Sequence, residues 1–206
     1  MKKYIENGMS FAEYIKLIDD LLLDGRTTGP NQSDAMFNYG KLNRQRMHRL
    51  EKTVVLNESL REKVQNNKRT MIWLVITEGW CGDAAQNIPI IEKIAEASNG
   101  SIETRYVLRD ENLELMDAYL TNNARSIPKL IALDAAGGLE EIGTWGPRPA
   151  PSMDLFIELR NRGVEKPLIM ENLQRWYIAD KNQTIQAEFE KLLEDWNQSK
   201  ESAATS

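Results

Sequence analysis

The chain has 206 residues but only one cysteine, Cys81, and one histidine, His48. A single cysteine cannot form an internal disulfide bond, so a small secreted scaffold held by disulfides is excluded and a cytoplasmic location is expected. His48 has no second histidine or neighbouring cysteine with which to form a transition-metal site. We therefore expect no metal site and no cofactor, and we interpret His48 as a surface or structural residue.

Long apolar runs and a surplus of positive charge are missing as well. No segment approaches the roughly 18 consecutive apolar residues of a membrane span, and polar residues at 6–8 interrupt the N-terminal stretch. We therefore expect no membrane partner and no signal peptide. The chain carries 26 basic and 31 acidic residues, a net charge of −5, which argues against a nucleic-acid partner. Basic residues do gather at 41–52, but no aromatic residues interleave them. We interpret this cluster as a solvated face or a patch that pairs with acidic neighbours.

The most informative stretch begins at Met71. Residues 71–77 are apolar and β-branched, which predicts a buried strand, and a helical pattern follows Trp80-Cys81-Gly82-Asp83. Cys81 is thus expected at a strand-to-helix turn, where free N–H groups and the helix dipole favour a thiolate. The carboxylate of Asp83, two residues later, opposes ionisation. Solvent exposure would screen this repulsion, so we expect the thiol pKa to be modestly lowered.

Periodicity and capping residues predict the other elements of the chain. Helices are expected over 10–24, from 33 or 34 through 52, 57–68, 110–120, from a cap at Ser152 to about 162, and in two C-terminal segments around 169–177 and 185–196. Strands are expected over 102–108, 129–133 and 139–144, the last two joined by a turn at 134–138. The core order is therefore strand, helix, strand, helix, hairpin, helix.

This order resembles the thioredoxin-like superfamily at two places in the chain. Trp80-Cys81-Gly82 matches the start of the thioredoxin active-site motif, and Ser126-Ile127-Pro128 matches the cis-proline loop that faces it. The resemblance implies an α/β thioredoxin-like fold, with a central mixed sheet of four to five strands flanked by helices. The segment Trp145-Gly146-Pro147-Arg148-Pro149, together with Cys81-Gly82-Asp83, is similar to a bacterial branch of thioredoxin-like proteins.

The resemblance also suggests a division of the chain. The thioredoxin-like domain is expected over 57–163, preceded by an N-terminal helical extension, 1–56, packed on the core. A C-terminal helical extension, 164–197, follows it, and small polar residues predict a disordered tail over 198–206.

Three positions depart from the dithiol thioredoxins that the chain resembles. Ala84 stands where the second cysteine is expected, Asp83 replaces the proline between the cysteines, and Val75 replaces the buried acid that assists proton transfer. The resemblance therefore makes Cys81 the attacking cysteine and leaves it without an internal resolving thiol.

Two functions follow as alternatives. In the first, Cys81 is the catalytic nucleophile of monothiol thiol–disulfide exchange, and an external thiol releases the product. The substrate would lie in a groove formed by Trp80, Gly82, Asp83, Ile127, Pro128 and Trp145. In the second, the same groove holds a peptide or protein partner without catalysis. A dimer linked through Cys81 is a third alternative. Two features of the groove also have simpler interpretations: Pro128 as a rigid turn, and the two tryptophans as loop packing.

Overall fold

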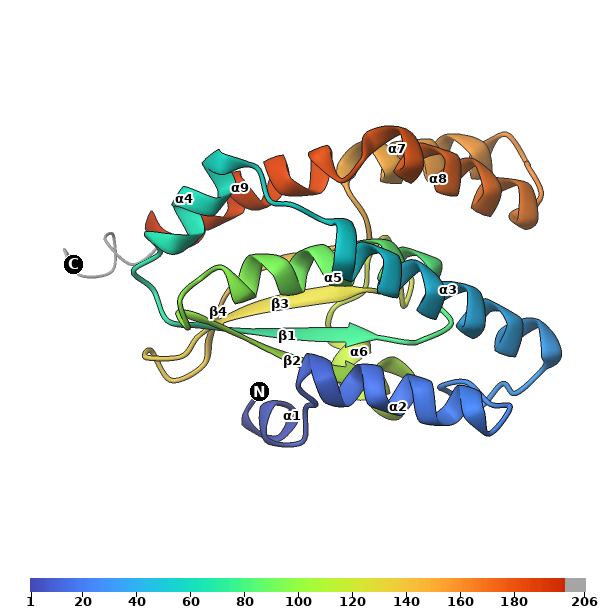
Figure 1. The fold of residues 1–206 in the computed structure, drawn as a ribbon, viewed down its shortest axis with the longest axis horizontal. Helices are drawn as coiled ribbons and strands as arrows, with labels where there is room; N and C mark the ends of the chain where they lie inside the picture. The colour runs from blue at the N-terminus through green and yellow to red at the C-terminus, as the bar shows by residue number, and fades with distance from the viewer. Residues whose placement is uncertain (199–206) are drawn as a thin grey trace.

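The structure is a computed structural model that describes residues 1–198 (Figure 1). Its helices are α1 (Lys2–Glu6), α2 (Phe11–Leu23), α3 (Asp34–Thr53), α4 (Glu58–Gln65), α5 (Gly82–Glu96), α6 (Leu113–Ala118), α7 (Ala150–Asn161), α8 (Lys166–Asp180) and α9 (Gln183–Gln198), with a 3-10 helix η1 (Arg109–Glu111). Its strands are β1 (Met71–Thr77), β2 (Ile102–Leu108), β3 (Lys129–Asp134) and β4 (Glu140–Trp145). None of the described helices combines the length and apolar character needed to cross a membrane.

The four strands form one mixed sheet in the order β2-β1-β3-β4. Strand β1 lies in the middle, parallel to β2 and antiparallel to β3, while β3 and β4 form the antiparallel hairpin. Its central position explains why almost every side chain of β1 is buried, as the continuous apolar run predicts. Helix α5 runs along the sheet with α3 beside it (Figure 1). This arrangement confirms the predicted α/β thioredoxin-like fold.

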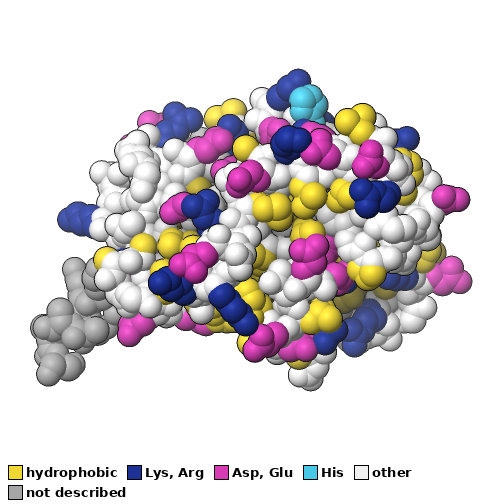
Figure 2. Space-filling model, turned by 90° about the horizontal axis from the view of Figure 1, so that it is seen from below, with side chains coloured by type: hydrophobic (Ala, Val, Ile, Leu, Met, Phe, Trp, Pro, Cys, Tyr) yellow, Lys and Arg dark blue, Asp and Glu magenta, His cyan; other side chains and the backbone are white. Residues whose placement is uncertain are grey.

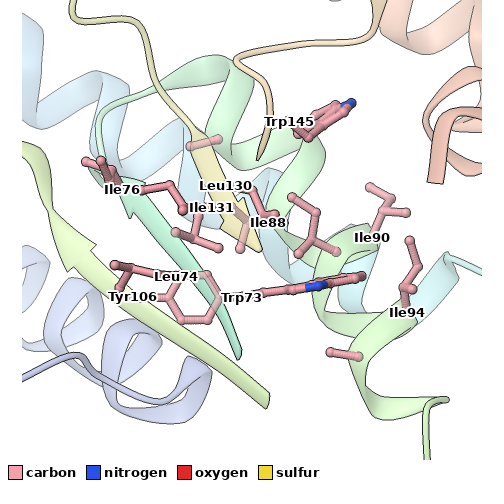
Figure 3. Close-up of a cluster of buried hydrophobic side chains, with 14 of the residues drawn as sticks. Trp73, Leu74, Ile76, Ile88, Ile90, Ile94, Tyr106, Leu130, Ile131 and Trp145 are labelled. Carbon is pink, nitrogen blue, oxygen red and sulfur yellow. The ribbon is translucent and has the colours of Figure 1, made fainter. Parts of the chain in front are cut away.

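The main hydrophobic core joins the sheet to α5 and α9. Trp73 of β1 lies at its centre among Ile88 and Ile94 of α5 (Figure 3). The ring centroid of Trp73 is 5.3 Å from that of Phe189 and 5.9 Å from that of Trp196, both on α9. Helix α9 is therefore built into the core by aromatic packing.

The N-terminal segment packs against β2, the edge strand next to β1. Ser10 and Glu13 form a capping box at the start of α2, as their spacing predicts. Tyr14 of α2 stacks on Tyr106 of β2 with ring centroids 5.4 Å apart, and Met9 forms an isolated backbone bridge to Tyr106. These contacts hold α2 against β2.

The helices α7 and α8 form an antiparallel pair, the α7–α8 hairpin. Its buried apolar residues form a cluster separate from the main core: Leu159, Ile169 and Leu173. The cluster contains residues from both helices, so the hairpin has a small core of its own.

Two local predictions were wrong. The helix expected over 110–120 is the shorter α6, preceded by η1, because Asn112 between them has a non-helical backbone with φ of −130° and ψ of 49°. Ser152 does not cap α7, which begins two residues earlier after Pro149; its hydroxyl is buried within the first turn instead. A proline pair, Pro149 and Pro151, fits this early start, since proline is tolerated in the first turn. The tail expected from 198 lies almost wholly outside the described residues.

The face of the molecule in Figure 2 mixes the two signs of charge. Lys and Arg side chains alternate with Asp and Glu, and the single histidine lies at the edge beside basic side chains. In the basic stretch of α3, Arg44 pairs with Asp19 and Glu51, as a patch with acidic neighbours would.

Candidate functional site

Cys81 is the N-cap residue of α5, where the sequence places it. Strand β1 ends at Thr77, and the chain turns through Gly79, whose N–H donates to Thr28 Oγ1 at 2.9 Å. A Cβ on Gly79 would lie 3.2 Å from Ile18 Cγ1, so the close approach of α2 favours glycine here. The N–H of Ala84 points at Cys81 Sγ over 3.5 Å. This turn is the thiol-bearing strand–helix junction that the motif predicts.

The cis-proline loop faces this thiol. The Ile127–Pro128 peptide bond is cis. Cys81 Sγ donates to the carbonyl oxygen of Ile127 at 3.2 Å. Cys81, Ile127 and Pro128 are therefore brought together, although they are far apart in the chain. The Ile127 carbonyl is therefore occupied by the thiol in this conformation.

The thiol is buried and protonated. Cys81 is only 8% exposed. Burial, followed by the charge of Asp83, raises the pKa of Cys81 to about 12, against the smaller opposing effects of the Ala84 and Asp83 N–H groups and Arg148. The expected modest lowering of the pKa was wrong, because the loss of hydration outweighs the favourable N–H groups. We call the conformation that the structure describes the closed form; in it Cys81 is protonated and does not act as a nucleophile.

Asp83 is the centre of a buried polar cluster. Arg148 donates to Asp83 Oδ2 from Nε at 3.2 Å and from Nη2 at 2.5 Å, and Tyr177 donates its hydroxyl proton to Oδ1 at 2.9 Å. Asn87 donates from Nδ2 to Tyr177 Oη at 3.0 Å. We call these four residues the Asp83 cluster. The side chains of the ion pair are only 8% and 10% exposed, so Asp83 does not lie in the screening solvent that the sequence suggested.

Arg148 and Tyr177 are site residues that sequence reasoning missed. Arg148 belongs to the Trp-Gly-Pro-Arg-Pro segment, and its guanidinium lies 4.4 Å from the ring centroid of Phe156. Tyr177 belongs to the segment around 169–177, for which the sequence predicts only a helix. A carboxylate in the first turn of a buried helix requires a charged partner, and this requirement was the available signal. It did not identify which arginine or tyrosine would satisfy it.

Helix α8 covers the N-terminal end of α5 through polar contacts. Besides the Tyr177 bonds, Gln86 donates from Nε2 to Gln174 Oε1 at 2.8 Å. Helix α8 is therefore linked by hydrogen bonds to the first turns of α5, next to the thiol, and Arg148, just before α7, adds one ion pair. Gly82, between Cys81 and the Asp83 cluster, stays partly exposed.

The two tryptophans lie in different surroundings. Trp80 is partly buried, with the guanidinium of Arg109 4.7 Å from its ring centroid. Trp145 is 7% exposed, packs against Phe189 at 5.4 Å, and donates from Nε1 to Glu188 Oε2 at 2.7 Å. Trp145 thus joins the main core, which matches the simpler interpretation of this residue.

The turn also holds a buried acid that sequence reasoning did not single out. Val75 is buried in β1 and carries no charge, but Glu78, just after the strand, is fully buried. Its Oε1 accepts from the Asp110 N–H at 2.9 Å, and Oε2 has no hydrogen-bond partner among the described residues. Burial raises the pKa of Glu78. Within residues 1–198, no group of three or more His, Cys, Asp or Glu side chains is arranged to hold a metal ion.

The fold and this site define a thioredoxin-like protein, with a helix-capping thiol facing a cis-proline. The model of a family described as thioredoxin matches residues 29–160, more than half of the chain, and the chain belongs to that family. No curated protein matches it.

Two solved structures share the fold. A protein of unknown function from Pseudomonas aeruginosa has a TM-score of 0.57 and 17% identity, covering 93% of this chain and 95% of that one. An epitope-scaffold carrying an HIV epitope has a TM-score of 0.59 and 16% identity, covering 94% and 96%. At these identities the likeness extends to the fold alone.

Proposed function

We propose that this protein is a monothiol thiol–disulfide oxidoreductase in which Cys81 is the nucleophile and an external thiol completes the reaction. One observation carries the proposal: the only thiol of the chain caps α5, receives the Ala84 N–H, and faces the cis Ile127–Pro128 bond. Thioredoxin chemistry uses this arrangement to attack a disulfide. Ala84 supplies no second thiol, so release of the product has to be intermolecular.

The proposed exchange has two balanced steps. The Cys81 thiolate attacks one sulfur of a disulfide RS–SR′, an S–S bond to R forms, and R′S⁻ leaves and takes up the proton that Cys81 lost. A second thiol then attacks the sulfur of R, leaves joined to it as a disulfide, and returns Cys81 to the thiol form. Protein thiols and small thiols are both chemically suited to the second step.

Exchange requires a form more open than the one described. A thiol with a pKa of about 12 and 8% exposure has almost no thiolate at neutral pH and no room for a disulfide. We propose that movement of the α7–α8 hairpin, whose Tyr177 binds Asp83 two residues from Cys81, hydrates the thiol and removes the burial that raises its pKa. The proposal therefore treats the hairpin as a cover whose opening precedes chemistry.

The alternative is a binding module without catalysis, and the buried thiol favours it. In that case Cys81 serves as a hydrogen-bond donor to Ile127 and as core packing, and a partner occupies the groove once the cover opens. A dimer linked through Cys81 would need the same opening. A thioredoxin-like domain over 57–163, the cytoplasmic location and a bacterial source remain predictions.

The presence of a single cysteine makes the test direct. Reaction of the whole protein with a disulfide probe reports Cys81 alone, and Cys81→Ser gives the blank. The exchange proposal predicts a mixed disulfide whose rate of formation keeps rising with pH past the ordinary thiol pKa of ~8.5, followed by release with a small thiol. If neither the wild type nor the cover variant Tyr177→Phe forms a mixed disulfide, the binding-module alternative replaces exchange.

A second variant tests the scaffold. Ala84→Cys places a thiol where dithiol thioredoxins have one, at a position that is 1% exposed. We expect this variant to gain insulin-reducing activity that the wild type lacks. Failure in a folded protein would indicate that the groove no longer accepts a protein disulfide.

A further inference from the structure

Two donors from opposite ends of the chain meet above Gly82, the neighbour of Cys81. A Cβ on Gly82 would lie 3.5 Å from Gln174 Nε2 of α8 and 3.9 Å from Arg46 Nη1 of α3. Both helices lie outside the predicted thioredoxin-like domain. Gly82 is partly exposed and places no side chain between the two donors and the helix backbone.

Arg46 lacks a counterion. Within residues 1–198 no carboxylate oxygen lies within 4.0 Å of its guanidinium, and its one hydrogen bond runs from Nη1 to Asn43 Oδ1 at 3.0 Å. Burial, together with repulsion from Arg49, lowers the pKa of Arg46. Arg44, on the same helix, has two carboxylate partners. A partly buried guanidinium without an anion is unfavourable, and a bound anion would relieve the cost.

Both donors are held in position by their neighbours. Asn43, which orients Arg46, is 1% exposed and donates from Nδ2 to the Gly79 carbonyl at 3.5 Å, within the turn that carries the thiol. Gln174 accepts from Gln86 through Oε1, so its Nε2 remains a donor.

The carboxylate of Asp83, the residue after Gly82, is already engaged. Asp83, next to Gly82, accepts from Arg148 and Tyr177. It therefore does not serve as the missing counterion of Arg46, and the space above Gly82 favours an anion supplied from outside the chain.

We propose that Arg46 and Gln174 form a subsite that binds the carboxylate of a small thiol or disulfide before the α7–α8 hairpin opens, and that Arg46, which lies on α3, keeps this carboxylate while Cys81 reacts. The inference rests on the proposed function and names its substrate class: carboxylate-bearing low-molecular-weight thiols, in preference to neutral ones. A planar guanidinium binds a carboxylate through two parallel hydrogen bonds, and Gln174 adds a third donor. The helical extensions would then supply substrate recognition that the thioredoxin core lacks.

The test compares two chromogenic disulfides, the dianionic 5,5′-dithiobis(2-nitrobenzoate) and the neutral 4,4′-dithiodipyridine. In each reaction the Cys81 thiolate displaces one aromatic thiolate, so the rate of colour release measures the same S–S exchange. We expect Arg46→Gln to lower the ratio of the anionic to the neutral rate by about tenfold or more, the size expected for a charge-assisted contact. Arg49→Gln removes the same charge from an exposed position one turn along α3, and should change the ratio by less than about threefold.

Gly82→Ala gives an independent check. The new Cβ would make ordinary van der Waals contacts with Gln174 and Arg46, so the protein should fold while the carboxylate space is filled. This variant should lose the anionic preference as Arg46→Gln does. An unchanged ratio in Arg46→Gln, with both probes reacting, overturns the subsite and leaves the proposed function standing.

A binding measurement covers the case in which Cys81 does not react. Cys81→Ser is titrated calorimetrically with 3,3′-dithiodipropionate and with neutral hydroxyethyl disulfide. Selective binding of the dicarboxylate that Arg46→Gln abolishes supports the subsite even if exchange fails. Absence of selective binding together with no reaction overturns both proposals.

Discussion

The two C-terminal helices α8 and α9 are joined to the thioredoxin core in different ways. Helix α9 contributes Phe189 and Trp196 to an aromatic cluster with Trp73, and these contacts belong to the main core. Helix α8 contacts α5 through a hydrogen bond that Tyr177 donates and one that Gln174 accepts, while its apolar residues pack in the separate cluster of the α7–α8 hairpin. Hydrogen bonds can be exchanged for bonds to water, whereas buried aromatic surface cannot. The comparison indicates that α9 stays packed in the core, whereas the α7–α8 hairpin is the part that can open.

The largest effect should come from truncating α9 in the core. We expect Phe189→Ala to lower the free energy of unfolding by about 3–5 kcal/mol, because it removes a fully buried ring between Trp73 and Trp145. Urea denaturation measures this loss. Leu159→Ala in the hairpin cluster is the matched control and should affect global unfolding less while making Cys81 more accessible. Equal losses in the two variants would mean that the hairpin and the core unfold as one unit.

Removing the cation of the Asp83 cluster should come next. Arg148→Met leaves Asp83 buried without its charged partner, which we expect to destabilise the closed form by roughly 3 kcal/mol. Arg125→Met is the control, because Arg125 pairs with Asp117 at an exposed site with side chains 46% and 48% exposed. That loss should stay below about 1 kcal/mol. Denaturation combined with Cys81 labelling separates opening of the hairpin from unfolding. Similar losses of stability in both variants would show that the Asp83 cluster contributes no more than an exposed ion pair.

A smaller effect is expected from the hydroxyl of Tyr177. Tyr177→Phe removes the bond to Asp83 and the acceptor of Asn87 Nδ2, at a cost of about 1–2 kcal/mol to closure. Labelling of Cys81 should become about tenfold faster, with the midpoint of global unfolding nearly unchanged. A shifted midpoint without faster labelling would show that Tyr177 supports the core rather than the cover.

The smallest effect concerns pH and the buried acid beside the site. Burial raises the pKa of Glu78 above its value in the unfolded chain, so the folded protein binds this proton more tightly. Its contribution to stability is full below the ordinary carboxyl pKa and falls as pH rises through the raised pKa. Glu78→Gln should therefore gain stability relative to the wild type as pH rises above the ordinary carboxyl pKa, as denaturation across pH measures. Glu111→Gln, at an exposed site, is the control. If the difference in stability between Glu78→Gln and the wild type did not change with pH, the raised pKa of Glu78 would be contradicted.

The parts of the fold that depend on local sequence could be predicted. The apolar run and the alternation gave β1 and β2 their observed bounds, and Ser10 with Glu13 marked the start of α2. The position of Cys81 at a helix N-terminus facing Pro128 also followed from short motifs. These features depend on neighbouring residues or on a motif with a fixed place in the fold.

The electrostatics of the site could not be predicted in the same way. Arg148 and Tyr177 lie 65 and 94 residues from Asp83 in the sequence. Their meeting depends on the packing of the α7–α8 hairpin, which no local pattern encodes. The thiol pKa could not be predicted for the same reason. The N–H groups that lower this pKa are local, whereas the burial that raises it comes from distant elements.

The hydrogen bond from Cys81 to the Ile127 carbonyl links the chemical state of the sulfur to the shape of the protein. A thiol can donate this bond, but a thiolate or a mixed disulfide cannot. Any modification of Cys81 therefore removes this contact and frees the Ile127 carbonyl. By reciprocity, a partner that takes the Ile127 carbonyl makes the sulfur easier to oxidise. Oxidation and partner binding would then be coupled through a single hydrogen bond.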